Sequence, residues 1–160
     1  MKRQSNCDRL GPTVGVRETR RLQALYRITG QDIAGGTRFA DGIVACDNPI
    51  DDVMRDSAEM THEAAVGQGA YYTIPFRALV PETVENLLFA GRLICADPVA
   101  FASVRGMPQC MAMGQATGVA AAMALKGALR VQDVNCETLA GVLQQQGMAG
   151  IAGRTLGAAG

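Results

Sequence analysis

The chain has 160 residues, 15 Lys and Arg balanced by 15 Asp and Glu, and 48% hydrophobic residues. This length suits one domain with a single core, and the zero net charge excludes a protein drawn electrostatically to nucleic acid or a membrane surface. The five cysteines form no Cys-x-x-Cys pair and have no histidine at ligand spacing, so no local metal or iron–sulfur site is expected. An odd cysteine count without a secretory signal indicates the cytoplasm, and no apolar run is long enough to span a membrane.

The N-terminal part predicts a polar lead-in and one short helix. Residues 1–14 are expected to be extended, and residues 22–28 fit either a helix or a strand because their apolar spacing suits both. Thr29 followed by Asp32 is typical of a helix N-cap with an acid at the third position. The pattern therefore predicts one helical turn over residues 30–34, which the two following glycines end.

The middle of the chain combines two predicted strands with an acidic segment between them. Residues 42–46 indicate a short buried strand, and residues 71–81 indicate an edge strand broken by a turn, because prolines interrupt their β-branched and aromatic residues. Residues 47–69 are acidic and small. This composition favours a solvated surface flap over a divalent metal site, since no glycine-turned loop gathers the carboxylates. His62 lies in this flap and is either a general base or an ordinary surface histidine.

A third predicted strand leads toward a long helix. Residues 86–90 form an apolar run of the kind that is buried on both faces of a parallel sheet. Gly91 and Arg92 follow at its carboxyl end, where ligands dock in open α/β sheets. After a loop, a helix is expected to begin at Pro108 and to continue up to Gly127, which we expect as its C-cap.

Small residues recur every four positions along that helix, at Gly114, Gly118 and Ala122, and form a smooth stripe. The stripe permits close approach either by a neighbouring backbone or by a flat ring. The helix N-terminus would offer unpaired N–H groups and a partial positive charge to an anion or an electron-rich ring. A final helix is predicted after a cap at Asn135, and residues 148–160 indicate a flexible tail.

Four segments together resemble the carboxyl end of the FAD-dependent oxidoreductases. They are GVRETRRL, YYTIPFRALVP, NLLFAGR and SVRGMPQCMAMGQATGVAAAMAL, in that order and at similar spacing. The match is closest to the broad group that resembles the flavin part of heterodisulfide reductase. The resemblance covers residues 15–147 and implies an α/β domain, the C-terminal fragment of a Rossmann-like FAD-binding fold. It also favours a flavin ring, rather than a neighbouring backbone, at the glycine stripe.

The resemblance implies which residues would bind FAD. Gly91 would let the backbone pass close to the ribityl and pyrophosphate portion, Arg92 would pair with phosphate, and Arg105 would lie near the flavin or a bound substrate. The amides facing the N1–C2 carbonyl edge of the isoalloxazine ring would be those of Gly114, Gln115 and Ala116. Oriented amides stabilise the negative charge that a reduced flavin gains at this edge.

Three charged residues are candidates for the substrate pocket. Arg17, Glu18 and Arg77 either line a pocket for a small-molecule substrate or form internal ion pairs. No residue is assigned a catalytic role.

The sequence departs from the family at one important motif. It contains no Gly-x-Gly-x-x-Gly turn of the strand–turn–helix unit that binds the ADP half of FAD. We therefore expect a fragment that a partner chain or a missing N-terminal domain completes, with weak FAD binding or none and no activity of its own. The alternative is a non-catalytic remnant or interaction module that self-associates through exposed apolar surface.

Overall fold

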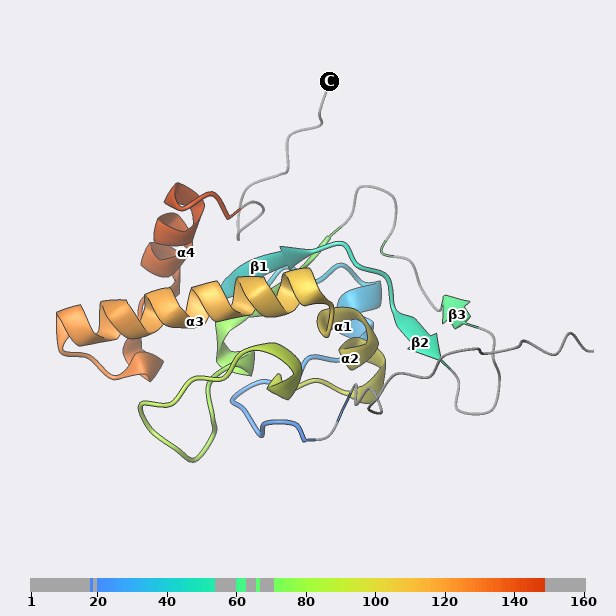
Figure 1. Ribbon diagram of the computed structural model, residues 1–160, viewed down its shortest axis with the longest axis horizontal. Coiled ribbons are helices and arrows are strands. Elements are labelled where there is room, and N and C mark those ends of the chain that lie inside the picture. Colours follow the sequence, from blue (N-terminus) through green and yellow to red (C-terminus); the bar gives the residue numbers. More distant parts are fainter. Residues whose placement is uncertain (1–17, 19, 54–59, 63–65, 67–70, 149–160) are drawn as a thin grey trace, which may run out of the picture.

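The computed structural model describes residues 18, 20–53, 60–62, 66 and 71–148. At its centre two antiparallel strands, β1 (Gly42–Cys46) and β4 (Tyr72–Pro75), pair with each other, and β1 packs against the long helix α3 (Met107–Gly127) (Figure 1). The remaining elements are α1 (Gly30–Ala34), β2 (Asp51–Val53), β3 (Met60–His62), the 3-10 helices η1 (Phe76–Ala78), η2 (Gly91–Leu93) and η3 (Val131–Asp133), α2 (Pro98–Val104) and α4 (Cys136–Gln145).

The β1–β4 pair is almost entirely buried and confirms the strand predicted over residues 42–46. The ladder is irregular next to Gly42, where the register shifts between Gly42 and Val44. A Cβ at Gly42 would lie 2.5 Å from the hydroxyl oxygen of Thr73, and that hydroxyl accepts the Phe39 N–H at 2.8 Å. Only glycine leaves room for this hydrogen bond, because any side chain would displace the threonine.

The predicted parallel sheet is wrong for the described residues. Both sheets there are two-stranded and antiparallel, β1 with β4 and β2 with β3, and the parallel pairing is limited to one isolated bridge between Ile28 and Ala96. No strand forms over residues 86–90, and Leu87 is 38% exposed. A continuous apolar run forms a buried strand only where neighbouring strands flank it on both edges, and the described chain offers none here.

Residues 22–28 form neither the helix nor the strand that their spacing allowed. They lie between two other segments and bond to both. The Leu25 N–H donates to the Val80 carbonyl at 3.1 Å, and the Ile28 N–H donates to the Cys95 carbonyl at 3.0 Å. The segment thus ties the stretch after β4 to the stretch after η2.

Helix α2 lies in the segment between Arg92 and Pro108, where the sequence predicted only a loop. In the structure Asp97 is the N-cap of α2, accepting the Ala100 N–H at 2.7 Å, and Pro98 occupies the first helical turn. The second carboxylate oxygen of Asp97 accepts the Gly30 N–H at 3.0 Å, at the start of α1. One side chain therefore stabilises the N-termini of two helices that pack together.

The predicted caps of α1 and α4 are confirmed. Thr29 and Asp32 form a reciprocal capping box at α1, and Asn135 accepts the Thr138 N–H at 2.8 Å at α4. At the end of α3, however, the left-handed residue is Ala128, with φ 51°, and Gly127 still belongs to the helix. The predicted lead-in lies outside the described residues, as does the predicted tail apart from its first residue.

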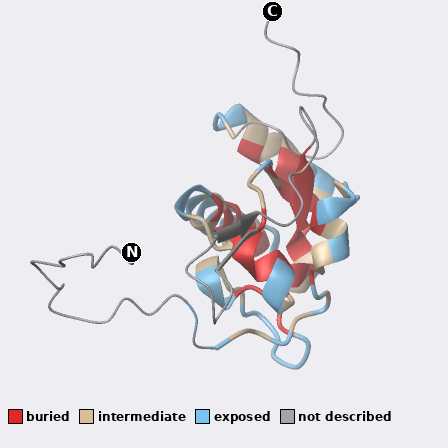
Figure 2. Cartoon of the chain, turned by 90° about the vertical axis from the view of Figure 1, so that its right-hand side faces the viewer, coloured by how far each residue is buried: buried red, intermediate tan, exposed pale blue. Residues whose placement is uncertain are grey.

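Packing of α3 on β1 forms the core. The apolar buried residues of α3 are Met113, Ala116, Ala120 and Ala124. Since three of these four residues are alanines, the helix axis approaches the strands closely. Figure 2 shows the buried residues gathered in the interior of the described chain; they come from α1, α2, α3, α4 and the β1–β4 pair.

Candidate functional site

The N-terminus of α3 differs from those of the other α-helices in the described part of the chain because no side chain caps it. Its N-cap is Gly106, whereas Thr29, Asp97 and Asn135 cap α1, α2 and α4. A 21-residue helix carries a partial positive charge at this end, together with free N–H groups. Because no side chain of the described residues caps this end, its N–H groups suit a negatively charged or carbonyl-bearing ligand.

Two loops place the predicted site residues around this helix end. Gly91 has φ 78°, and its backbone lies against the first turn of α3, since a Cβ there would be 3.8 Å from Cys110. The carbonyl of Arg105, the C-cap of α2, accepts a hydrogen bond from the Cys110 thiol at 3.5 Å. Burial raises the pKa of the Cys110 thiol, and the Arg92 guanidinium partly offsets that rise. The structure therefore brings Gly91, Arg92 and Arg105 together at the start of α3.

Sequence reasoning missed Gln109, the most unusual polar side chain here. Gln109 is only 7% exposed, and its Oε1 atom is buried with no hydrogen-bond partner in the described structure. The amide lies so close to Gly106 that a Cβ at that position would overlap it. The unpaired Oε1 atom of Gln109 can accept a hydrogen bond, and the N–H groups at the start of α3 can donate them. An isoalloxazine ring presents the matching groups, since its N3–H is a donor and its carbonyls are acceptors.

The amides predicted to face the flavin do not lie at the helix start. Since α3 begins at Met107, Gly114, Gln115 and Ala116 lie in its second and third turns, where backbone N–H groups are bonded within the helix. The Gln115 side chain donates to Gln146 after α4 at 3.0 Å, and Ala116 is fully buried in the core. The helix start predicted at Pro108 is thus correct to within one residue, and only the flavin-facing amides implied by the family resemblance were placed one to two turns too far along the helix.

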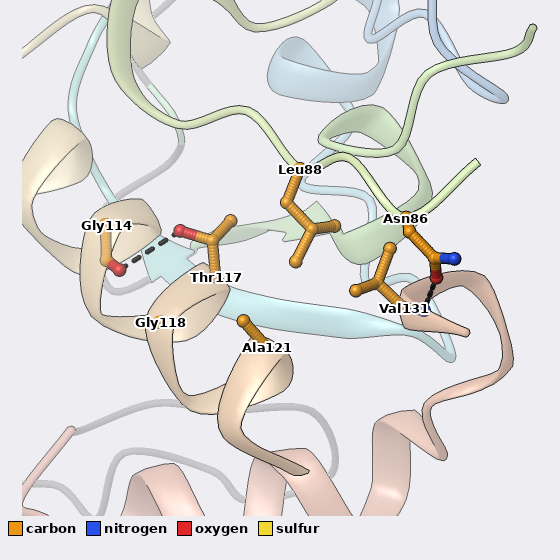
Figure 3. Close-up of a pocket in the computed structure, with 7 residues that line it drawn as sticks. All are labelled: Asn86, Leu88, Gly114, Thr117, Gly118, Ala121 and Val131. Atoms are coloured by element: carbon orange, nitrogen blue, oxygen red, sulfur yellow. Dashed lines mark hydrogen bonds between the residues drawn. The ribbon is translucent and has the colours of Figure 1, made fainter. Parts of the chain in front are cut away.

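The glycine stripe of α3 lines a shallow groove of about 350 Å³ (Figure 3). Gly114, Gly118 and Ala121 form its floor, with Leu88 and Val131 on the facing wall. A Cβ at Gly114 or Gly118 would meet no atom within 4 Å. The close-packed neighbouring backbone that the stripe permits is therefore absent from the described structure.

Of the predicted substrate residues, the two that the structure describes form ion pairs. Glu18 pairs with Arg21, and Arg77 pairs with Asp41 at 3.1 Å. The Arg77 guanidinium also lies 4.7 Å from the centre of the Tyr26 ring. These contacts match the alternative interpretation, in which these charges stabilise the fold. Arg17 lies outside the described residues.

The acidic flap contains the antiparallel hairpin of β2 and β3, which was not expected. His62 ends β3, and the placement of its side chain lies outside the described part of the chain. Within the described residues no group of three or more His, Cys, Asp or Glu side chains is placed to hold a metal ion. The described helices include none long and apolar enough to cross a membrane.

Comparison with known proteins decides the family. A family model described as FAD dependent oxidoreductase matches residues 3–143, most of the chain. The chain belongs to the FAD-dependent oxidoreductase family. FAD is thus its cofactor, and its mixture of helices with small sheets is consistent with an α/β FAD-binding fold. No curated protein and no solved structure matches the chain.

Proposed function

We propose that this chain provides the flavin-ring side of an FAD-dependent oxidoreductase site at the N-terminus of α3. The observation that carries the proposal is the uncapped start of the longest described helix, with Gly91, Arg92 and Arg105 around it, in a family that is FAD dependent. The amides of Met107 and Gln109 take over the role that the sequence had given to Gly114, Gln115 and Ala116.

The residues at this end suit a flavin for electrostatic reasons. FAD, when bound, supplies the acceptor for a hydride or electrons from a small-molecule substrate. The helix terminus, equivalent to about half a positive charge, stabilises negative charge at the N1–C2 edge without reorganising. Gln109 would accept a hydrogen bond from the ring N–H, and Arg92 would pair with phosphate.

We further propose that a Gly-x-Gly-x-x-Gly unit on a partner chain or another domain holds the ADP half of FAD. The printed sequence has no such motif, and the described residues contain no βαβ unit. The likeness to the flavin part of heterodisulfide reductase and substrate binding by Arg17, Glu18 and Arg77 remain predictions of the sequence.

A titration with FAD tests this assignment. Difference absorbance of the flavin band, measured while the 160-residue chain is added to FAD, should show weak binding, with a dissociation constant of about 0.1–1 mM. Replacing Arg92 by alanine should weaken binding about threefold, because an exposed charge pair contributes up to about 1 kcal/mol. Arg130→Ala is the matched control, since it removes an exposed arginine beyond the far end of α3.

Two outcomes would contradict the proposal. Tight, stoichiometric binding by the chain alone would show that no second unit is required. Equal affinity of the Arg92→Ala and Arg130→Ala variants would mean that the flavin does not bind near η2.

A further inference from the structure

Two arginines from distant parts of the chain lie against the same aromatic ring. The guanidinium carbon of Arg21 lies 4.7 Å from the centre of the Phe101 ring, and that of Arg105 lies 5.9 Å from the same centre. Phe101 is fully buried in α2, whereas both arginines are only partly buried. The two guanidinium groups, called here the Arg21–Arg105 pair, therefore lie together where the core meets the surface, held by the attraction of cations to the ring.

The Arg21–Arg105 pair adjoins the start of α3. Arg105 ends α2 and directly precedes Gly106, the N-cap of α3. The Leu22 N–H donates to the Leu93 carbonyl at 2.8 Å, which holds the segment of Arg21 beside η2. The proposed flavin position lies at the same two elements, η2 and the first turn of α3. A group bound by the pair would therefore be a neighbour of the flavin.

Arg21 is ordered before any ligand binds. Its Nη1 atom donates to the Ala96 carbonyl at 2.9 Å, and the Phe101 ring supports the guanidinium. Its Nε atom is buried and has no hydrogen-bond partner among the described residues. A guanidinium that is already ordered loses little conformational freedom when it binds an anion. An anion nearby would also offset the cost of the unpaired buried donor.

A carboxylate already contacts Arg21 in the structure. Glu18 pairs with the Nη2 atom of Arg21, and the Glu18 side chain is 40% exposed. The guanidinium can therefore bind a carboxylate on the side that faces solvent, in the planar geometry that arginine provides. Because a solvent-exposed ion pair is weak, a second carboxylate can displace Glu18 at little cost.

We propose that the Arg21–Arg105 pair binds the carboxylate group of the substrate, which makes the substrate class of this oxidoreductase a small organic carboxylate. The role in substrate binding rests on the proposed function, because that function places the flavin at the start of α3. Glu18 pairs with Arg21 in the absence of substrate and competes with it. A carboxylate replaces the single negative charge of Glu18 by another single charge, whereas a phosphate would bring nearly two.

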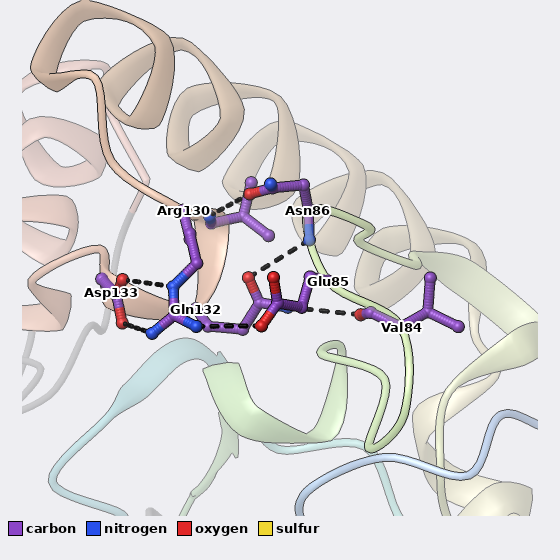
Figure 4. Close-up of polar contacts among 7 residues, drawn as sticks. Val84, Glu85, Asn86, Arg130, Gln132 and Asp133 are labelled. Atoms are coloured by element: carbon purple, nitrogen blue, oxygen red, sulfur yellow. Dashed lines mark hydrogen bonds and ion pairs between the residues drawn. The ribbon is translucent and has the colours of Figure 1, made fainter.

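An NMR titration of the isotope-labelled 160-residue chain with sodium acetate tests the binding. The Nε–Hε signals of Arg21 and Arg105 should shift and saturate, with a dissociation constant on the order of 10 mM, since acetate offers few atoms for contact. Sodium chloride keeps the ionic strength constant, because screening alone affects exposed charges. Arg130 is the internal control. It pairs with Glu85 at 3.0 Å and with Asp133 at 2.8 Å beyond the far end of α3 (Figure 4), and its signal should not show saturable binding.

A Glu18→Gln variant separates ligand binding from a purely structural role. Removing the competing carboxylate should strengthen acetate binding about threefold, and a misfolded variant could not produce this gain. The matched control is Asp133→Asn, which removes a carboxylate from Arg130 and should leave acetate binding unchanged. Arg21→Gln and Arg105→Gln should each weaken acetate binding at least about fivefold, while circular dichroism shows both variants folded.

Titration of the same variants with FAD distinguishes this proposal from the flavin assignment. Arg21→Gln should leave FAD affinity within about twofold of that of the original chain, because Arg21 contacts the substrate. An equal loss of FAD affinity in Arg21→Gln and Arg92→Ala would place Arg21 at the flavin and overturn the proposal. Normal FAD affinity in Arg92→Ala, together with saturable acetate binding, would contradict the flavin assignment and support the carboxylate site.

Three further results would overturn the proposal. Acetate up to about 100 mM could fail to produce a saturable shift at Arg21 and Arg105. Acetate affinity could stay the same in Glu18→Gln, which would mean that the ion pair with Arg21 is only structural. Inorganic phosphate could bind at least about tenfold more tightly than acetate, which would show that the pair serves a phosphate group.

Discussion

Ser103 is a buried residue whose importance the sequence does not indicate. Ser103 is fully buried, and its hydroxyl donates a hydrogen bond to the Asn48 carbonyl at 2.6 Å. Because that hydroxyl has one proton, the contact of 2.7 Å with Tyr72 must be donated by the tyrosine. Asn48 in turn donates to the Ser103 carbonyl at 3.2 Å. This small network joins α2 to β4 and to the loop after β1.

Replacing Ser103 by alanine should lower the free energy of unfolding by about 2 kcal/mol, since the Asn48 carbonyl and the Tyr72 hydroxyl both lose the buried serine hydroxyl as a hydrogen-bond partner. Denaturant titration measures this change. Tyr72→Phe should cost about 1 kcal/mol, and the double variant should cost less than the sum of the single variants. Additive costs would show that the network is not coupled.

At the scale of elements, the two ends of α3 show what local sequence rules miss. The helix begins at a glycine without a capping side chain and ends at an alanine in the left-handed conformation, with φ 51°. The left-handed alanine is locally unfavourable, and the glycine N-cap supplies no side-chain oxygen to the first N–H groups of the helix. The uncapped start coincides with the proposed flavin site, where strain or missing bonds are common. The end leads directly into η3, which forms the wall of the groove.

Ala128→Gly should raise the free energy of unfolding by about 0.5–1 kcal/mol, because glycine adopts a positive φ without steric cost. Ala122→Gly is the matched control on the exposed face of the same helix, where glycine should cost about 1 kcal/mol. Thermal unfolding of both variants shows whether each substitution raises or lowers the stability of the protein. Destabilisation by Ala128→Gly would contradict the left-handed assignment.

At the scale of the whole molecule, the buried core controls stability at alkaline pH. Burial raises the pKa of the Cys46 thiol to about 12, and burial also raises the pKa of the Tyr72 hydroxyl. The unfolded chain therefore loses these protons at lower pH than the folded chain does. Their stabilising effect is complete below about pH 9 and is lost as the pH rises toward 12.

The free energy of unfolding should consequently fall between about pH 9 and pH 12, by up to about 1.4 kcal/mol per pH unit for each of the two groups. Urea titrations at several pH values measure the slope. Cys46→Ala should reduce the slope, because it removes one titrating group. A slope that Cys46→Ala does not change would show that the thiol ionises equally in both states.

Local patterns in the sequence determined the capped helices, the buried strand over residues 42–46 and the family. A cap such as Thr29 with Asp32 needs only neighbours within four residues, and a family motif needs only order and spacing. The neighbourhood of Gly91, Arg92 and Arg105 followed from the family motifs in the same way.

The tertiary structure alone decided the features that depend on distant partners. Residues 86–90 have the composition of a buried strand but form none, since strand formation requires neighbours that the described chain does not place there. The orphaned amide of Gln109 and the exposure of the apolar residues of α3 also depend on packing between segments far apart in sequence. Periodicity reports which side chains share a face, whereas only the folded chain determines what covers that face.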